Sequence, residues 1–476
     1  MIGRARLFLI VLLGAACTQK SVGPNQPPVA AAGGPYTTNT GTVSFDGSAS
    51  ADPDGDALTY RWNFGDGGSS TEARPSHAYG ALGTFTVGLT VTDAKGSASA
   101  PASTSAHVNN VAPAVTAGTN TAVPVGTTYA LSATFADGAD GPWNYTIQWG
   151  DGATQNGTRS AQGAITGTHT YASESNYRIQ VNVADRFGAQ GSDSLTVTAT
   201  APVLIAAGDI GDCLRPNDEA TGALLDGLEG IVAPLGDNAY ENGTPTEFAN
   251  CYDSGWGRQK ARTRPVPGNH DYYNPRPDSV KNADGYFGYF GASAGDPAKG
   301  YYSYTLGSWF VIVINTGTER SGDIAAGSPQ DQWLRAELAS HSQQCVLAMF
   351  HHPRFTSILD RPWLRPEVKP LWDALYQYGA DLVLNGHDHG YQRFAPQTPD
   401  GVADPAYGVR QITVGTGGGE GLYQFSDVVP NLQVRDNQTY GVLKLTLRAG
   451  GYDWRFVPIA GKTFTDSGSG TCHGSP

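Results

Sequence analysis

The chain has 476 residues, of which 39% are hydrophobic and 15% charged. A single hydrophobic core rarely grows beyond roughly 250–300 residues, so this length predicts two or three domains. The formal net charge of −13 argues against a nucleic-acid partner bound along its phosphates, because such binding needs an excess of Lys and Arg.

The first 17 residues have the layout of an export signal: two arginines, an apolar run at 7–13 too short to span a bilayer, then Gly14-Ala15-Ala16-Cys17. The segment resembles a bacterial lipoprotein signal with its lipobox, which implies lipid on Cys17. Ordinary cleavage after Ala16 is the alternative. Both interpretations place the protein outside the cytoplasm, either membrane-anchored at the cell surface or periplasm, or secreted.

If Cys17 carries lipid, four cysteines remain, and an even number in an oxidising compartment favours two disulfides. Of the three possible connectivities we favour Cys213–Cys251 with Cys345–Cys472, which would staple an early loop and pin the C-terminal tail. A thiolate metal site is the alternative, although the chain contains no C-x-x-C pair.

Residues 18–28 are polar and rich in proline, which is typical of a tether. Residues 29–108 show short alternating segments separated by Gly, Asp and Pro, and residues 112–199 repeat the plan; this pattern predicts two antiparallel β-sandwiches.

Two landmarks mark the repeat: Trp62-Asn63-Phe64-Gly65-Asp66-Gly67 recurs as Trp149-Gly150-Asp151-Gly152, and His77-Ala78-Tyr79 as His169-Thr170-Tyr171. They resemble the PKD domain, an immunoglobulin-like module. The two modules are expected to act as spacers, or to bind a surface protein or glycan.

In the first sandwich, Asp52-Pro53-Asp54-Gly55-Asp56 places oxygen ligands at alternating positions, as in a calcium loop. A hydrated turn held by Asx hydrogen bonds is the simpler interpretation.

After residue 202 the pattern changes to α/β, and we expect one domain over 203–460 with a tail at 461–476. Apolar runs alternate with helical stretches such as 219–228. The expected strands are 203–207, 231–235, 310–314, 346–350 and 381–384.

Five segments of this domain end a strand and then present residues that bind metal ions, which is where α/β sheets place their sites. They supply two carboxylates, an amide oxygen, three imidazoles and a phenol, which together suit two adjacent cations. In chain order they are Gly208-Asp209-Ile210-Gly211, Gly236-Asp237-Asn238-Ala239-Tyr240, Gly268-Asn269-His270-Asp271, His351-His352-Pro353 and Gly386-His387-Asp388-His389.

The order and spacing of these motifs resemble the calcineurin-like metallophosphoesterases, and within them the purple acid phosphatases. The resemblance implies a four-layer αββα domain that holds Fe(III) together with Zn, Mn or Fe(II), the phenolate of Tyr240 favouring ferric iron. It assigns Asp209, Asp237, Tyr240 and His389 to one metal ion, and Asp237, Asn269, His351 and His387 to the other.

The resemblance also implies that His270 contacts the phosphate or protonates the leaving alkoxide, with Asp271 orienting it. His352 would be either a phosphate contact or a group packed beside the ligands. The family carries a further substrate-contacting histidine after the fourth motif, which residues 355–361 lack. Arg354 or Arg361 would hold phosphate instead.

The run Gly415-Thr416-Gly417-Gly418-Gly419 looks like a phosphate-cradling loop but lacks the lysine of a P-loop. We therefore expect it to be a strand-end turn near the active site.

The sequence thus predicts an exported, acid phosphatase-like enzyme that hydrolyses phosphate monoesters with hydroxide held on two metal ions. A phosphodiesterase or nucleotide hydrolase is the alternative, because the ligands fix the reaction and not the alcohol. A third hypothesis is a non-catalytic adhesion protein with an inert α/β domain. That protein would be expected to lack ligands, and none of the seven is missing.

Overall fold

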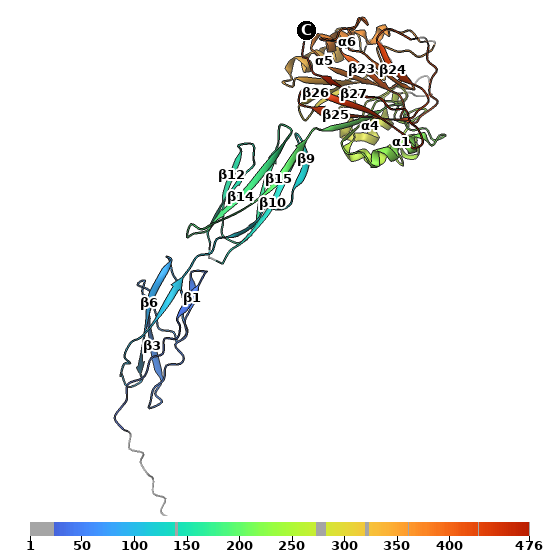
Figure 1. Ribbon diagram of the computed structural model, residues 1–476. Helices are drawn as coiled ribbons and strands as arrows, with labels where there is room; N and C mark the ends of the chain where they lie inside the picture. Colours follow the sequence, from blue (N-terminus) through green and yellow to red (C-terminus); the bar gives the residue numbers. More distant parts are fainter. Residues whose placement is uncertain are drawn as a thin grey trace, which may run out of the picture.

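The computed structural model describes residues 23–138, 141–272, 282–318, 323–359, 361–426 and 428–475. The export signal and Cys17 lie outside these residues, so their interpretation stays a prediction. Figure 1 shows two narrow β-sandwiches in line, followed by a larger α/β domain. Among the described helices, none combines the length and the apolar character that crossing a membrane requires.

The first sandwich packs a five-stranded sheet, in the order β1-β7-β6-β3-β4, with the two-stranded pair β2-β5. Alternate residues of β6 are buried from Val87 to Asp93, as expected for a strand with one face on a core. The strands are β1 (Tyr36–Thr38), β2 (Thr42–Ser44), β3 (Leu58–Asn63), β4 (Ser69–Ser70), β5 (Ser76–Ala78), β6 (Gly83–Asp93) and β7 (Ala102–Val108).

The second sandwich packs a three-stranded sheet, β13-β10-β8, against a five-stranded one, β12-β11-β14-β15-β9. Its strands are β8 (Ala114–Thr116), β9 (Thr121–Pro124), β10 (Thr128–Ala136), β11 (Trp143–Gln148), β12 (Thr154–Arg159), β13 (Gly163–Thr170), β14 (Ser175–Ala184) and β15 (Gln190–Thr200).

The repeated landmarks occupy equivalent places in the two sandwiches, but Trp149 corresponds to Phe64 and not to Trp62. The buried hydroxyl of Tyr79 donates a hydrogen bond to the carbonyl of Phe64 at 3.1 Å, and that of Tyr171 donates the equivalent bond to Trp149 at 2.9 Å. The expectation that the two tryptophans align is therefore wrong by two residues.

The acidic run in the first sandwich forms the Asx turn that the simpler interpretation expects. The backbone amides of Asp54 and Asp56 donate to Asp52 Oδ1 at 2.8 and 3.2 Å. The carboxylates of Asp52, Asp56 and Asp93 also gather, with oxygen atoms within 4.8 Å of one another, while Lys95 Nζ lies 2.8 Å from Asp56. A calcium ion at this turn stays a prediction.

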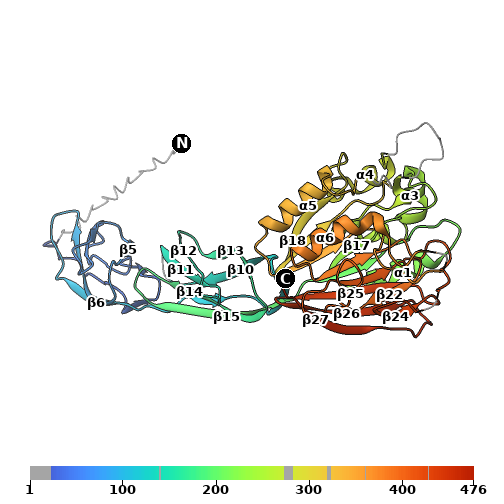
Figure 2. The same cartoon turned by 90° about the horizontal axis from the view of Figure 1, so that it is seen from above.

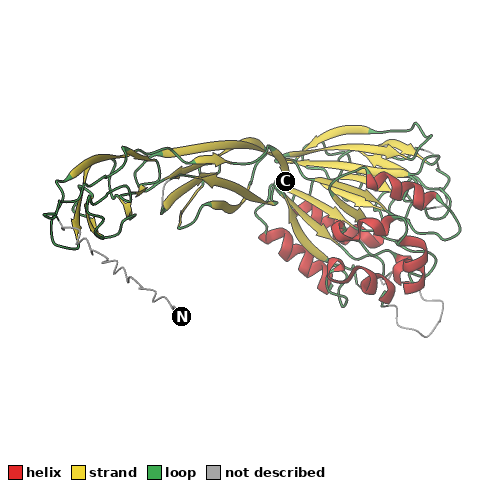
Figure 3. Ribbon diagram, turned by 90° about the horizontal axis from the view of Figure 1, so that it is seen from below, coloured by secondary structure: helices red, strands yellow, loops and turns green. Residues whose placement is uncertain are grey.

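The α/β domain contains two sheets packed face to face, with the orders β17-β16-β25-β26-β27 and β18-β19-β20-β21-β23-β22-β24. Figures 2 and 3 show α5 and α6 covering the outer face of the seven-stranded sheet. The strands are β16 (Val203–Ala207), β17 (Ile231–Pro234), β18 (Tyr302–Leu306), β19 (Trp309–Val313), β20 (Cys345–Met349), β21 (Leu382–Asn385), β22 (Tyr391–Phe394), β23 (Arg410–Val414), β24 (Leu432–Asp436), β25 (Gly441–Arg448), β26 (Gly451–Pro458) and β27 (Ser467–Thr471).

Short helices connect these strands, and α1 packs against β25 of the five-stranded sheet. The α-helices are α1 (Asn217–Asp226), α2 (Pro245–Glu247), α3 (Asn269–Tyr272), α4 (Asp284–Phe290), α5 (Pro329–Ser340) and α6 (Lys369–Gln377); the other short helices are η1 (Phe248–Tyr252), η2 (Trp256–Arg262), η3 (Gly291–Ala294) and η4 (Pro366–Val368).

The sequence of strand β19 is an unbroken apolar run because both faces of the strand are buried. All five of its residues are buried. Trp309, Val311 and Val313 point into the core between the two sheets, and Phe310 and Ile312 point into the core beneath α5 and α6. A strand with a core on each face has no polar face, so its sequence loses the period of two. The expected fold, two all-β sandwiches followed by a four-layer α/β domain, is confirmed.

The C-terminal segment expected to be a tail belongs to this domain. Strand β27 pairs antiparallel with β26 and forms the edge of the five-stranded sheet. Disulfides join Cys345 to Cys472 and Cys213 to Cys251, the pairing favoured above. Residues beyond 460 thus complete the sheet and are bonded covalently to the start of β20.

Replacing Cys345 and Cys472 together by Ser should lower the free energy of unfolding of the α/β domain by about 2–5 kcal/mol, because the disulfide restricts the unfolded chain. Calorimetry of the full chain measures this. The two sandwiches, which contain no cysteine, provide an internal control. A shift of their transition, or none in that of the α/β domain, would contradict the expectation.

Candidate metal centre

The candidate ligands lie where the carboxyl ends of strands from both sheets meet. Asp209 and Asp237 follow the parallel neighbours β16 and β17 of one sheet. His351 and His387 follow the parallel neighbours β20 and β21 of the other. Parallel strands end at a common edge, so side chains from distant parts of the sequence converge here.

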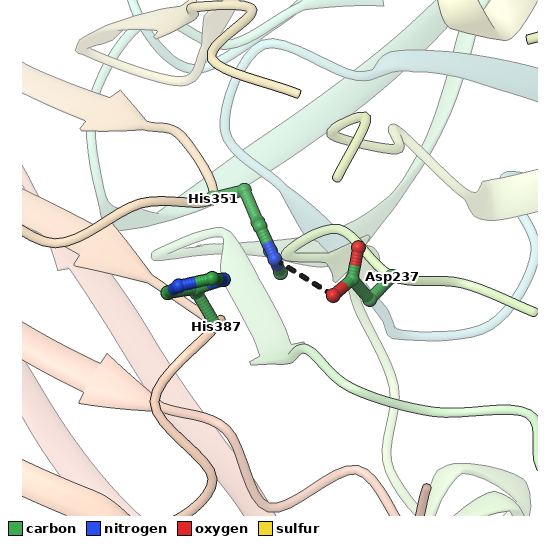
Figure 4. A group of neighbouring side chains, drawn as sticks. All are labelled: Asp237, His351 and His387. Carbon is green, nitrogen blue, oxygen red and sulfur yellow. Dashed lines mark ion pairs between the residues drawn. The ribbon is translucent and has the colours of Figure 1, made fainter. Parts of the chain in front are cut away.

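Figure 4 shows three of these side chains facing one another. The ligand atoms of Asp237, His351 and His387 all lie within 4.8 Å of one another, and His351 Nε2 is 2.9 Å from Asp237 Oδ2. The Nδ1 of His351 donates to the carbonyl of Leu235 at 2.7 Å. This bond fixes the imidazole orientation and leaves Nε2 for the centre, as the outer bond of a metal-binding histidine usually does.

A second group of side chains surrounds Asp209. The hydroxyl of Tyr240 lies 3.2 Å from Asp209 Oδ1, 3.1 Å from His389 Nε2 and 3.5 Å from Asp237 Oδ2. His389 Nε2 is 3.3 Å from Asp209 Oδ1. Asp237 therefore contacts both groups and occupies the place expected of a ligand shared between two ions.

Asn269 completes the set, because its Oδ1 lies 3.1 Å from His387 Nδ1. All seven expected ligands are thus brought to one place. Among the described residues, the buried Oδ2 of Asp209 has no hydrogen-bond partner, and such an orphaned carboxylate oxygen is costly unless something binds it. Carboxylate, imidazole, amide and phenol donors together fit a pair of metal ions.

Burial disfavours the charged forms of both Asp237 and His351, yet each side chain stabilises the charge on the other. Burial raises the pKa of Asp237, but His351 and His270 bring it below its ordinary range. Burial lowers the pKa of His351, but Asp237 raises it to about 9. Burial and the carboxylates of Asp209 and Asp237 raise the pKa of Tyr240 well above 10, so a phenolate at this position requires a cation beside it.

Three of these residues have an unusual backbone conformation. Asp209, Asp237 and His387 have φ angles of 63°, 49° and 65°, in the left-handed region that costs a residue with a side chain roughly 1–2 kcal/mol. Such strain persists where surrounding structure enforces it, and it is typical of functional sites.

His270 lies beside the centre, but Asp271 does not orient it as expected. The His270 Nδ1 donates to the carbonyl of Glu241 at 2.7 Å. Asp271 instead accepts from the Gly268 amide and from Asn238 Nδ2, both at 2.8 Å, and burial raises its pKa to about 7. Its role is to join the second and third motif loops.

Of the two arginines expected to hold phosphate, Arg354 is used elsewhere. Its guanidinium donates to the carbonyls of Pro399, at 3.1 Å, and Arg365. These bonds bridge two loops, and within the described residues no hydrogen bond joins Arg354 to a candidate ligand; a phosphate contact by Arg354 stays a prediction. Arg361 lies nearer to the candidate ligands. Its guanidinium is 5.1 Å from the centre of the Tyr423 ring, and that ring stacks on the ligand His389.

His352 lies against the ligands, its ring centroid 4.2 Å from that of His387. Its Nδ1 lies 3.0 Å from Thr316 Oγ1, and burial together with nearby cations lowers its pKa well below 6.5. His352 is therefore packed beside the ligands, which was one of its two expected roles. The other, a contact with phosphate, stays a prediction.

Arg365 and the role of Asp388 were not predicted from the sequence. The buried Asp388 lies between His387 and His389 in the fifth motif and accepts from Arg365 Nη2 at 2.8 Å and from Arg361 Nη1 at 2.9 Å. The signal was present in the motif itself. A carboxylate between two ligands on a buried turn needs a cationic partner, and residues 361 and 365 supply it.

The glycine-rich run begins where β23 ends, as expected of a strand-end turn, and closes over the ligand loops. The amides of Gly417 and Gly419 donate to the carbonyls of Gly208 and Asp209 at 2.9 and 2.8 Å. A Cβ at Gly419 would lie 2.5 Å from the ring of Tyr240. Glycine is needed here because the backbone approaches the phenol ring so closely.

Comparison with known proteins places families on both parts of the chain. Residues 25–108 and 110–200 each match the PKD domain family, and residues 203–391 match the calcineurin-like phosphoesterase family. Collagenase ColA of Bacillus cereus is 45% identical over 64 residues, which are 13% of this chain and 7% of that protein.

Two plant proteins match a larger part of the chain. Purple acid phosphatase 18 of Arabidopsis thaliana is 29% identical over 157 residues, 31% of this chain and 34% of that protein. Probable inactive purple acid phosphatase 1 of the same plant is 27% identical over 236 residues, 42% and 37% of the two chains. The chain thus spans about a third of the length of each phosphatase.

Replacing Gly419 by Ala should weaken metal-ion affinity at the Tyr240 site by roughly 10- to 100-fold, the usual effect of disturbing groups that orient ligands, because the new methyl group displaces Tyr240. Metal titration followed by elemental analysis measures it. Gly421→Ala is the matched control, since no atom lies within 4 Å of a Cβ there. Equal affinities of the two variants would contradict the role assigned to this loop.

Proposed function

We propose that this chain, which carries two PKD domains followed by a calcineurin-like phosphoesterase domain, is an exported phosphatase that hydrolyses phosphate monoesters at a binuclear metal centre. The observation that carries the proposal is the convergence of seven donor side chains, among them the buried carboxylates of Asp209 and Asp237, around an Asp209 oxygen that has no hydrogen-bond partner among the described residues. The match to purple acid phosphatases supports the same chemistry.

The donors divide into two sets that share Asp237. The proposed ions are Fe(III) and one of Zn, Mn or Fe(II). When bound, they supply Lewis-acid stabilisation of a phosphate and lower the pKa of a water molecule. The sets are Asp209, Asp237, Tyr240 and His389 for the first ion, and Asp237, Asn269, His351 and His387 for the second.

Besides holding the metal ions, the protein would supply a proton donor, His270. The bond from His270 Nδ1 to the carbonyl of Glu241 fixes the tautomer of the neutral ring, so the proton exchanged in catalysis would be carried at Nε2. The ring lies 4.7 Å from that of Tyr240, at the edge of the centre. We assign to His270 protonation of the leaving alkoxide.

Export is supported by the two disulfides, which persist in oxidising compartments and are rare in a reducing cytosol. We further propose that Cys17 carries a lipid anchor, and that the PKD domains space the enzyme from the membrane or bind a surface protein or glycan.

Replacing Asp237 by Asn should reduce monoester hydrolysis by at least roughly a thousandfold, because a bridging ligand contributes several kcal/mol through both ions. Release of phosphate from an aryl monoester measures it, beside Asp400→Asn, an exposed carboxylate with 70% of its side chain accessible. Undiminished activity of the Asp237 variant would contradict the proposal. A parent protein that prefers the aryl bis-ester would indicate the alternative, a phosphodiesterase.

Iron bound by Tyr240 should give the purified protein a broad visible absorption band, which Tyr240→Phe removes, because the band arises from charge transfer between phenolate and ferric iron. Visible spectra with elemental analysis measure both. Tyr423→Phe, a change to a neighbouring phenol that is not a proposed ligand, is the control. A colourless, iron-free protein with full activity would indicate a different metal pair.

A further inference from the structure

A pocket of about 220 Å³ adjoins the candidate metal centre. His352 and His387 form its inner wall, Ile324 and Val368 supply apolar surface, and Arg365 and Glu367 supply charge. Since His387 is also a proposed metal ligand, a phosphate ester held at the centre would lie beside this pocket. The pocket is larger than the transferred phosphate requires and has room for a small leaving alcohol.

Arg365 is the charged group built into this wall. Its side chain is buried, with the residue 7% exposed, and Nη2 donates to Asp388 at 2.8 Å. Within the described part of the chain its Nε has no hydrogen-bond partner. A buried donor without a partner is costly, so the guanidinium is not fully satisfied by Asp388 alone.

The local charge favours a singly charged anion. Arg361, which is partly exposed, and the buried Arg365 both pair with the one carboxylate of Asp388, so the three groups together keep a single net positive charge. Glu367, exposed at the pocket, disfavours a second negative charge. A carboxylate matches both conditions and the planar fork of a guanidinium.

We propose that this pocket binds the leaving group of the substrate, and that Arg365 pairs with a carboxylate on that group. The preferred substrates are then phosphate monoesters of small hydroxy acids. The inference rests on the proposed phosphatase function and adds to it the chemical class of the alcohol that leaves. Arg365 acts as a specificity-determining residue, and Glu367 limits the charge that the pocket accepts.

Two esters that differ at one carbon test the proposal: 3-phosphoglycerate, with a carboxylate, and glycerol 3-phosphate, with a hydroxymethyl group in its place. The parent protein should show a kcat/KM at least roughly tenfold higher for 3-phosphoglycerate, the gain expected from a charge-assisted hydrogen bond. Arg365→Gln should bring the ratio of the two kcat/KM values close to one, and Arg365→Lys should restore part of it.

Glu367→Gln should act in the opposite direction, lowering KM for 3-phosphoglycerate, because it removes a like charge from the pocket. Arg335→Gln removes an arginine that pairs with Asp331 and Gln377 away from the pocket, and it is the control for loss of charge. Melting temperature and metal content of each variant separate a folding defect from a loss of selectivity.

No preference in the parent would overturn the proposal, as would an equal loss of both activities in Arg365→Gln, which would place the guanidinium on the transferred phosphate. Binding of the two compounds, measured by thermal shift of the metal-loaded protein, needs no turnover. A parent that hydrolyses neither ester would contradict the phosphatase proposal, while tighter Arg365-dependent binding of 3-phosphoglycerate would still support the pocket.

Discussion

The structure of the α/β domain depends on two carboxylates held out of water next to each other. Asp209 is fully buried and Asp237 is 2% exposed, and burying one uncompensated carboxylate costs several kcal/mol. His351 offsets part of the charge, and Tyr240 and His389 add hydrogen-bond partners, yet one oxygen of Asp209 keeps no partner among the described residues. Bound cations would offset the remainder, so the same arrangement that lowers the stability of the metal-free domain favours binding of metal ions.

Several features around the carboxylates hold this unfavourable arrangement in place. Strands from both sheets end at the centre, and the extensive core between the sheets fixes their directions. The left-handed backbone at Asp209 and Asp237 adds strain that the packed sheets must offset. The glycine-rich run then closes over Tyr240, leaving no space for another side chain at Gly419. Rigid surroundings keep the donors oriented before any ligand arrives, which lowers the cost of binding.

Much of this fold could be predicted from the sequence, because strands buried on both faces are unbroken apolar runs and β16 coincides with the expected residues 203–207. Four of the five motifs were visible because each follows such a strand; the third follows residues 263–266, which form only isolated bridges and no strand. Interactions between distant loops could not be predicted. Arg365 reaches Asp388 only through the tertiary fold, and Asp271 bonds Asn238 instead of its neighbour His270. The repeat was misaligned at Trp149 because one tryptophan can replace a phenylalanine in the same core position.

The direction of one strand determines where the centre faces. Strand β16 begins at Val203, three residues after β15 of the second sandwich ends at Thr200, and its far end leads to Asp209. Five residues of strand extend roughly 16 Å, so Asp209 lies beyond the end of β16 that points away from the second sandwich. The connection at this junction is short, and an ion pair joins Arg448 to Glu174 across it at 3.6 Å. A chain tethered near its N-terminus would therefore present the centre away from its point of attachment, where dissolved esters reach it without passing the sandwiches.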